Sequence, residues 1–229
     1  VDRQDLGSRG MSSQSGFTLR EKILLHGLTL SGVFFVLFPM ARPFFDETTL
    51  AGAMQFASGR WVLAHSLGMF GLILMPVGFF GSYLFFRETR AEKAAFNAFI
   101  TNLIGAGLTL PFFGAEAFSL QVIGHAAVDM NNPALIPLVN QVRFGPGLFF
   151  IGIGLILMSI STIIIARAAW ISGRMPKWAG IPLAVGFVLF MPLLQGDPAF
   201  QWMRIADGLL ILAGCFILVR KTRSLAEAN

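Results

Sequence analysis

The chain has 229 residues, of which 55% are hydrophobic and only 13% are charged, and its formal net charge is +5. Soluble domains carry about 45–50% apolar and about 25% charged residues, so this composition excludes an ordinary soluble protein. The basic residues lie in short clusters between apolar runs, which is typical of membrane-flanking loops. This pattern predicts membrane lipid as a partner and argues against nucleic acid.

Six apolar runs approach the length of about 20 residues that a membrane-spanning helix needs. In chain order they cover residues 23–41, 61–86, 96–115, 147–168, 178–195 and 199–219. The sequence therefore predicts an all-α, multi-pass membrane protein with one six-transmembrane-helix domain over residues 20–223. Residues 1–19 form a polar N-terminal segment, and residues 224–229 form a short C-terminal tail.

Lysine and arginine are distributed unevenly between the two sides of the predicted bundle. With residues 1–10 left out of the count, the side that would hold both termini has eleven: Arg20, Lys22, Arg87, Arg90, Lys93, Arg167, Arg174, Lys177, Arg220, Lys221 and Arg223. The other side has four: Arg42, Arg60, Arg143 and Arg204. Because positive charge accumulates on the inner side, both termini are expected in the cytoplasm. The expected location is the bacterial plasma (inner) membrane.

The segment between the third and fourth predicted helices, residues 116–146, interrupts the apolar sequence. Pro111 can kink or end the third helix, and further prolines and glycines break the approach to the fourth. We therefore expect a partly helical outer cap, with one short helix at 115–129 followed by an irregular return.

Ionisable residues gather in the outer half of the predicted bundle. They are His65, Glu116, His125, Arg143, Arg204 and Asp207. Charged groups at this depth cost a few kcal/mol, so they should face the bundle interior and pair with one another. Two pairings, Arg143 with Glu116 and Arg204 with Asp207, would satisfy four of them without any function.

The leading functional interpretation is a binding or accessory membrane protein, whose polar ligand pocket opens to the outer side and contains these six residues. Asp129 would orient His125, and Asn140 would support the pocket from the approach to the fourth helix. Gln121, His125 and Asp129 also share one helical face, so an interfacial amphipathic helix with that face in water is an alternative for residues 115–129.

Two other classes of function stay open. His65, Glu116 and His125 could hold a divalent metal with one open position, or the two histidines could hold one haem, which would make the chain a membrane enzyme. A small solute transporter is the third class, although no comparable polar residues continue through the inner half. The sequence leaves the ligand and the assembly state open, including a homo-oligomer or a larger membrane complex.

Overall fold

The structure, a computed structural model, describes residues 19–194 and 198–226, which are helical or lie in short connections. Of the predicted N-terminal segment, residues 1–19, the structure describes only Leu19. Of the predicted tail, residues 224–229, it describes the backbone of residues 224–226. In chain order the elements are α1 (Leu19–Ala41), α2 (Leu50–Phe56), α3 (Gly59–Phe86), α4 (Glu92–Gly114), the π-helical turn η1 (Ala115–Ser119), α5 (Leu120–Asp129), the 3-10 turn η2 (Pro133–Leu135), α6 (Leu138–Arg143), α7 (Gly147–Ile171), α8 (Ile181–Leu194), the 3-10 turn η3 (Pro198–Phe200) and α9 (Gln201–Ala226).

Five helices in the described part of the chain are long and apolar enough to cross a membrane. They are α1, α3, the continuous helix from Glu92 to Asp129, α7 and residues Gln201–Thr222 of α9. Each of the six predicted apolar runs forms a helix, but α8 is shorter than the others, with 14 residues. The chain is therefore an all-helical protein with the architecture of an integral membrane protein.

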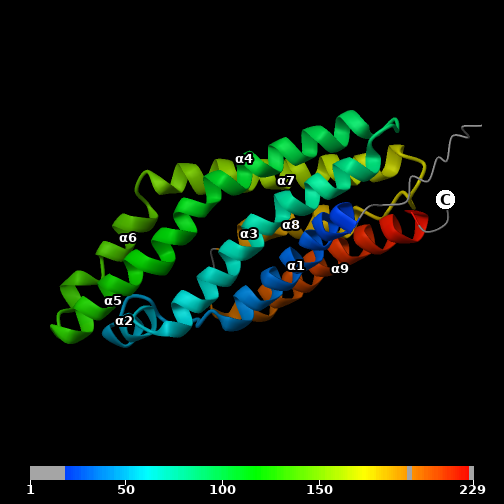
Figure 1. Cartoon of the computed structure of the whole chain (residues 1–229). Coiled ribbons are helices and arrows are strands. Elements are labelled where there is room, and N and C mark those ends of the chain that lie inside the picture. Colours follow the sequence, from blue (N-terminus) through cyan, green and yellow to red (C-terminus); the bar gives the residue numbers. More distant parts are fainter. Residues whose placement is uncertain (1–18, 195–197, 227–229) are drawn as a thin grey trace, which may run out of the picture.

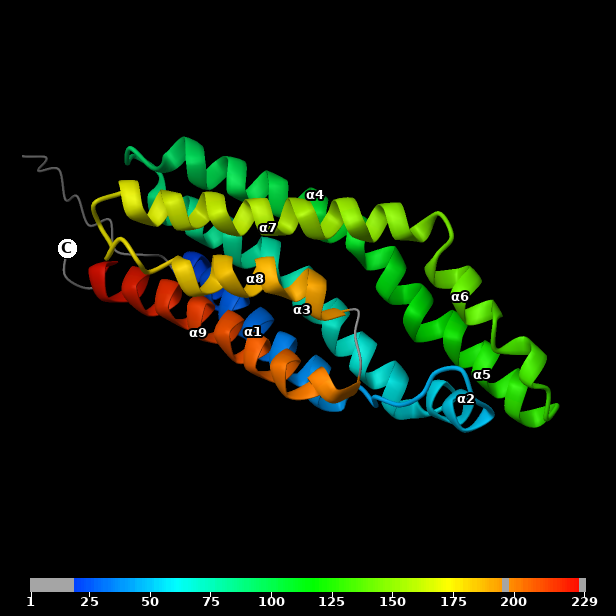
Figure 2. The same ribbon diagram turned by 180° about the vertical axis from the view of Figure 1, so that it is seen from behind.

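The six apolar helices form one ring in which each helix packs beside the next along the chain. The order is α1, α3, α4, α7, α8 and α9, and the ring closes where α9 packs against α1 (Figure 1). The short helices α2, α5 and α6 gather at one end and project past the ends of α1, α8 and α9 (Figure 2). The cavity described below lies inside the ring near this end.

The third apolar run does not end where the sequence predicts. Helix α4 continues through Pro111, passes through the π-helical turn η1 and runs on as α5, giving one helix of 38 residues. At a rise of about 1.5 Å per residue it is about 57 Å long, nearly twice the bilayer's hydrocarbon thickness of about 30 Å. The expected helix at 115–129 is present, but it extends α4, and the return contains η2 and α6.

Glycines bring the helices into backbone contact around most of the ring. A Cβ on Gly78 of α3 would lie 2.5 Å from the Leu28 nitrogen of α1, and one on Gly105 of α4 would lie 2.8 Å from the Gly154 oxygen of α7. Such close approach is how membrane helices gain packing contacts, because lipid supplies no hydrophobic driving force between them. Gly152 of α7, which faces the cavity, differs because a Cβ there would meet no heavy atom within 4 Å.

Candidate functional site

A cavity of about 650 Å³ occupies the interior of the ring at the end where α2, α5 and α6 gather. All six helices of the ring contribute to its walls, together with η1, α6 and the connection after α1. The charged and polar lining side chains are Arg42, Glu47, His65, Glu116, Asn140, Arg143, Arg204 and Asp207. The rest of the lining is almost entirely aromatic and aliphatic. This volume lies within the range of about 300–1,000 Å³ that is typical of small-molecule sites.

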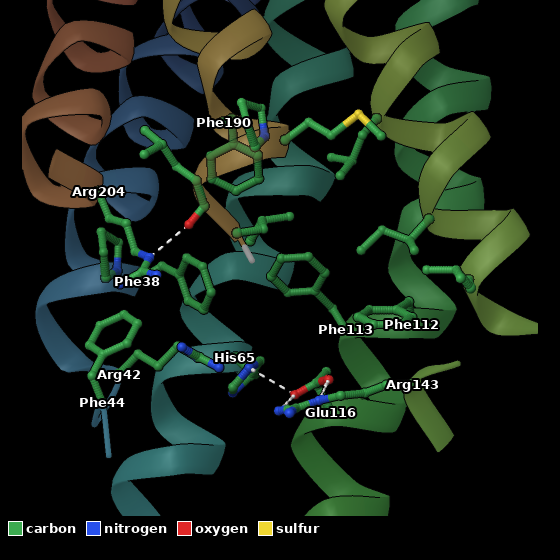
Figure 3. A pocket seen from close by; sticks show the side chains of 18 of the residues that line it. Phe38, Arg42, Phe44, His65, Phe112, Phe113, Glu116, Arg143, Phe190 and Arg204 are labelled. Carbon is green, nitrogen blue, oxygen red and sulfur yellow. Dashed lines mark hydrogen bonds and ion pairs between the residues drawn. The ribbon is translucent and has the colours of Figure 1, made fainter. Parts of the chain in front are cut away.

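Arg143, the last residue of α6, joins two carboxylates at the polar end. Its Nε and Nη2 donate to the two oxygens of Glu116 at 2.5 and 2.9 Å (Figure 3). Its Nη1 donates to Glu47. Burial alone would lower the pKa of Arg143, but its bonds to Glu116 and then Glu47 raise that pKa above its ordinary value. The predicted pairing of Arg143 with Glu116 is confirmed, and its two-pronged geometry is the strongest form of this interaction.

His65 of α3 is almost completely buried and has a defined hydrogen position. Its Nδ1 lies 2.9 Å from the carbonyl oxygen of Trp61, and because a carbonyl only accepts, Nδ1 carries the hydrogen. Nε2 faces Oε2 of Glu116 at 3.7 Å, which is too long for a hydrogen bond. When the ring is neutral, these two atoms are both acceptors and do not bond to each other, and Oε2 already accepts from Nη2 of Arg143.

Arg42, the first residue after α1, lines the cavity with a guanidinium most of whose N–H donors have no described partner. Among the described residues its side chain makes one hydrogen bond, from Nη2 to Glu47 at 3.2 Å, and it stacks on the rings of Phe44 and Trp61. A guanidinium has five N–H donors, so four remain for other acceptors. Burial lowers the pKa of Arg42 to about 10, an effect that Glu47 and Glu116 oppose, so the group is charged at neutral pH.

Asp207 and Arg204 on α9 do not form the pair that the sequence predicts. Arg204 donates from Nε to the Leu193 carbonyl at 2.7 Å and lies over the Phe44 ring, and the ion pairs of the described residues include none between it and Asp207. Oδ1 of Asp207 is buried and accepts no hydrogen bond there. The two residues are only three apart, but Arg204 points to the end of α8, and this direction leaves Asp207 unpaired.

The apolar part of the cavity has one open wall. On α1 and α4 the lining includes the buried side chains of Phe38, at 5% exposure, and Phe113, at 2%. On α7 and α8 the lining includes exposed residues, Leu148 at 36% and Met191 at 39%, beside buried ones such as Ile151. We define the gap between α7 and α8 that these two residues flank as the side opening of the cavity.

The structure brings together most of the residues that the sequence analysis proposed for a ligand pocket. His65, Glu116, Asn140, Arg143, Arg204 and Asp207 all line the cavity. His125 and Asp129 do not, because both are exposed on α5. The cause is the packing of neighbouring Gly124, where a Cβ would lie 2.7 Å from the Ala53 oxygen of α2. That contact fixes the rotation of α5, whose exposed positions include apolar Val122 beside His125 and Asp129, so only part of the exposed face is the polar face of the amphipathic alternative.

The metal and haem hypotheses therefore lose their ligand sets. His125 is separated from His65 and Glu116, and the described residues contain no group of three or more His, Cys, Asp or Glu side chains that could hold a metal ion. Haem ligation by two histidines needs the same two imidazoles and fails for the same reason. What remains at the polar end is a set of hydrogen-bond donors and acceptors.

Three lining residues near the polar end were not predicted as site residues from the sequence. Arg42, Phe44 and Glu47 belong to the connection between α1 and α2, which folds over the polar end of the cavity. The only signal was local: an arginine directly after the first apolar run, followed within five residues by two phenylalanines and two acids. No helical or strand periodicity describes such a connection, so its path is not predictable from pattern.

Comparison with known proteins identifies no relative. No known family, no curated protein and no solved structure matches the chain. Function is therefore inferred from the composition and geometry of the cavity.

Proposed function

We propose that this chain is a membrane-embedded binding protein whose cavity holds one amphiphilic molecule. The single supporting observation is that one cavity has both charged and extended apolar walls: Arg42, His65, Glu116 and Arg143 lie together on one side of it, and Phe190 lies away from them (Figure 3). The polar group of the ligand lies among Arg42, Arg204 and Asp207, and its apolar part lies against the walls formed by α4, α7 and α8. Such a ligand satisfies the spare donors of Arg42 and also fills the apolar space, which a small hydrophilic solute does not do.

The proposal includes an orientation in the membrane. All six helices of the ring cross, α8 as a short crossing, so both ends of the described chain lie on one side. The basic clusters favour the cytoplasm for that side. The cavity then opens toward the outer side, α2, α5 and α6 form a cap beyond the outer surface, and the natural location is a bacterial inner membrane.

Photolabelling tests the proposal. The purified protein, in lipid nanodiscs, is incubated with a palmitic acid that carries a diazirine near its methyl end, and labelled residues are mapped after irradiation. Labelling at cavity residues such as Phe112 and Leu148 is expected. The variant Gly152→Phe should abolish it, because this glycine faces the cavity and has free space around it.

The matched control is Gly107→Phe. Gly107 is also a helical glycine with no heavy atom within 4 Å of a Cβ, but it lies on the exposed surface of α4 and outside the cavity. It should keep the labelling pattern of the unaltered protein. Labelling of the cavity that is equal in all three proteins, or no cavity labelling in any of them, refutes the proposed function.

A further inference from the structure

We infer that the ligand of this cavity is a single-chain phospholipid with a free hydroxyl between its phosphate and its acyl chain, as in a lysophosphatidic acid. The inference rests on the proposed function and specifies its ligand class. Three observations carry it: the unused donors of Arg42, the unpaired buried oxygen of Asp207, and the shape of the apolar end with its side opening.

The free donors of Arg42 favour an anionic group on the ligand. Arg42 has four N–H donors without a described protein partner, and its guanidinium is held between Phe44 and Trp61, so its position is fixed before a ligand arrives. The carboxylates nearest to it are already engaged, since Glu47 and Glu116 both bind Arg143. A fixed guanidinium with free donors is a site for a group rich in acceptor oxygens, and phosphate presents such oxygens in matching geometry.

The buried oxygen of Asp207 favours a hydrogen-bond donor on the ligand. Oδ1 of Asp207 is buried, lines the cavity and accepts no hydrogen bond from a described residue. A buried acceptor without a partner carries the full cost of its lost hydration, so a ligand that supplies a donor gains that energy. The ligand must therefore carry a hydrogen-bond donor as well as an anionic group.

The positions of Arg42 and Asp207 set the order of these groups along the cavity. Gly208, the next residue of α9, packs against α1, where a Cβ on it would lie 2.7 Å from the Phe35 carbonyl oxygen. Because Phe35 precedes Arg42 by about two helical turns, Asp207 lies about two turns deeper than Arg42. Side chains of α9 lean toward its N-terminus, which brings the Asp207 carboxylate back toward Arg42. The donor of the ligand thus lies between its anion and its apolar part. In a lysophosphatidic acid the glycerol hydroxyl occupies this position.

The volume of the cavity limits the number of chains on the ligand. Apolar side chains of α4, α7 and α8, among them Phe113, Leu155 and Phe190, line the rest of the cavity, where one acyl chain passes toward the side opening between α7 and α8. A total volume of about 650 Å³ includes the polar end, so a second chain has no place inside. The side opening faces the bilayer, which is where such an amphiphile dissolves.

Competition with the photolabel tests the inference with three probes. They are 1-palmitoyl lysophosphatidic acid, hexadecyl phosphate, which lacks the hydroxyl, and dipalmitoyl phosphatidic acid, which has two chains. The lysophosphatidic acid should compete best. Hexadecyl phosphate should be weaker by about tenfold, the equivalent of one hydrogen bond to a buried charged group. The two-chain lipid should not compete in this range. This comparison needs only the unaltered protein.

Variants assign the contacts. Asp207→Ala should weaken competition by lysophosphatidic acid to the level of hexadecyl phosphate and leave hexadecyl phosphate unchanged. Arg42→Ala should weaken both phosphates at least tenfold. Asn102→Ala is the control for Asp207→Ala, because Asn102 also has a buried oxygen without a hydrogen bond but lies outside the cavity.

The outcomes separate the two claims. Cavity labelling without any difference between lysophosphatidic acid and hexadecyl phosphate, or with equal competition by the two-chain lipid, refutes the ligand class and leaves the binding cavity intact. Equal weakening of both phosphates by Asp207→Ala also refutes it. Absence of cavity labelling refutes the proposed function itself.

Discussion

At the scale of single residues, the buried pair of Glu116 and Arg143 offers the clearest energetic prediction. Arg143→Ala removes both hydrogen bonds of the Arg143 side chain from the buried Glu116 carboxylate, whereas Glu116→Ala leaves Arg143 bound to Glu47. We therefore expect a loss of about 3 kcal/mol for Arg143→Ala and a smaller loss for Glu116→Ala. The double variant should cost much less than the sum, because it leaves neither charge unpaired. Thermal unfolding in a mild detergent measures all three.

The same cycle on α9 provides the comparison. Arg204 and Asp207 are near in sequence but form no ion pair in the structure, so their alanine variants should be additive within about 0.5 kcal/mol. A strong coupling between them, together with additivity for Glu116 and Arg143, would show that the charged network is arranged differently from that in Figure 3.

Trp61 supplies a second prediction at this scale. Its indole nitrogen donates to the carbonyl of Glu116 at 2.6 Å, and its ring contacts Phe56 edge-on with centroids 4.9 Å apart. Trp61→Phe removes the donor and some volume, so a loss of about 1–3 kcal/mol is expected. Trp170→Phe is the control, because that ring is half exposed. If the two variants unfold at the same temperature, the Trp61 contact does not hold α3 to η1.

The residues of the site differ in how far the sequence could locate them. Counting residues along an apolar run gives depth, and this was enough to group His65, Glu116, Arg143, Arg204 and Asp207. Depth does not give the rotation of a helix about its axis. Sequence reasoning therefore assigned a false partner to Asp207 and placed exposed His125 in the pocket, although both lie at plausible heights.

At the scale of elements, the continuous helix from α4 to α5 shows why boundaries are harder to predict than helices. Pro111 removes one backbone donor, but neighbouring helices and local adjustments can tolerate this in a membrane helix. Here the helix remains unbroken and the π-helical turn η1 follows, with Glu116 on its buried side. The apolar runs themselves predicted α1, α3, α7, α8 and α9, because composition over about 20 residues is a strong signal.

The packing of α1 against α3 gives a prediction for one element pair. A methyl group on Gly78 would lie 2.5 Å from backbone and side-chain atoms of Leu28, so Gly78→Ala must push the two helices apart. Overpacking of this kind costs about 1–3 kcal/mol. Gly107→Ala, on an exposed helix surface with free space, should be neutral or stabilising. Unfolding temperatures that do not separate the two variants would contradict this helix contact.

At the scale of the whole molecule, charge and structure divide the bundle in the same way. The basic clusters that begin α1, end α3, begin α4 and end both α7 and α9 gather at one end, and the cavity lies toward the other (Figure 1). The proposed topology therefore predicts that Ser172→Cys and Asn132→Cys, in a Cys215→Ala background, react with a membrane-impermeant maleimide from opposite sides. Labelling of both from the cytoplasmic side would disprove it.

The 14 residues of α8 have a consequence for the surrounding lipid. Such a helix is about 21 Å long, whereas the hydrocarbon core is about 30 Å thick. In the proposed topology α8 is a short crossing, which thinning of the adjacent bilayer accommodates, so we expect the outer leaflet to dip beside α8. The dip would lower the lipid head groups toward the side opening and shorten the path of an amphiphile to Arg42. Photolabelling of the cavity should then decline as the protein is reconstituted in bilayers of longer acyl chains, which raise the mismatch; a rate independent of thickness would show that α8 does not thin its surroundings.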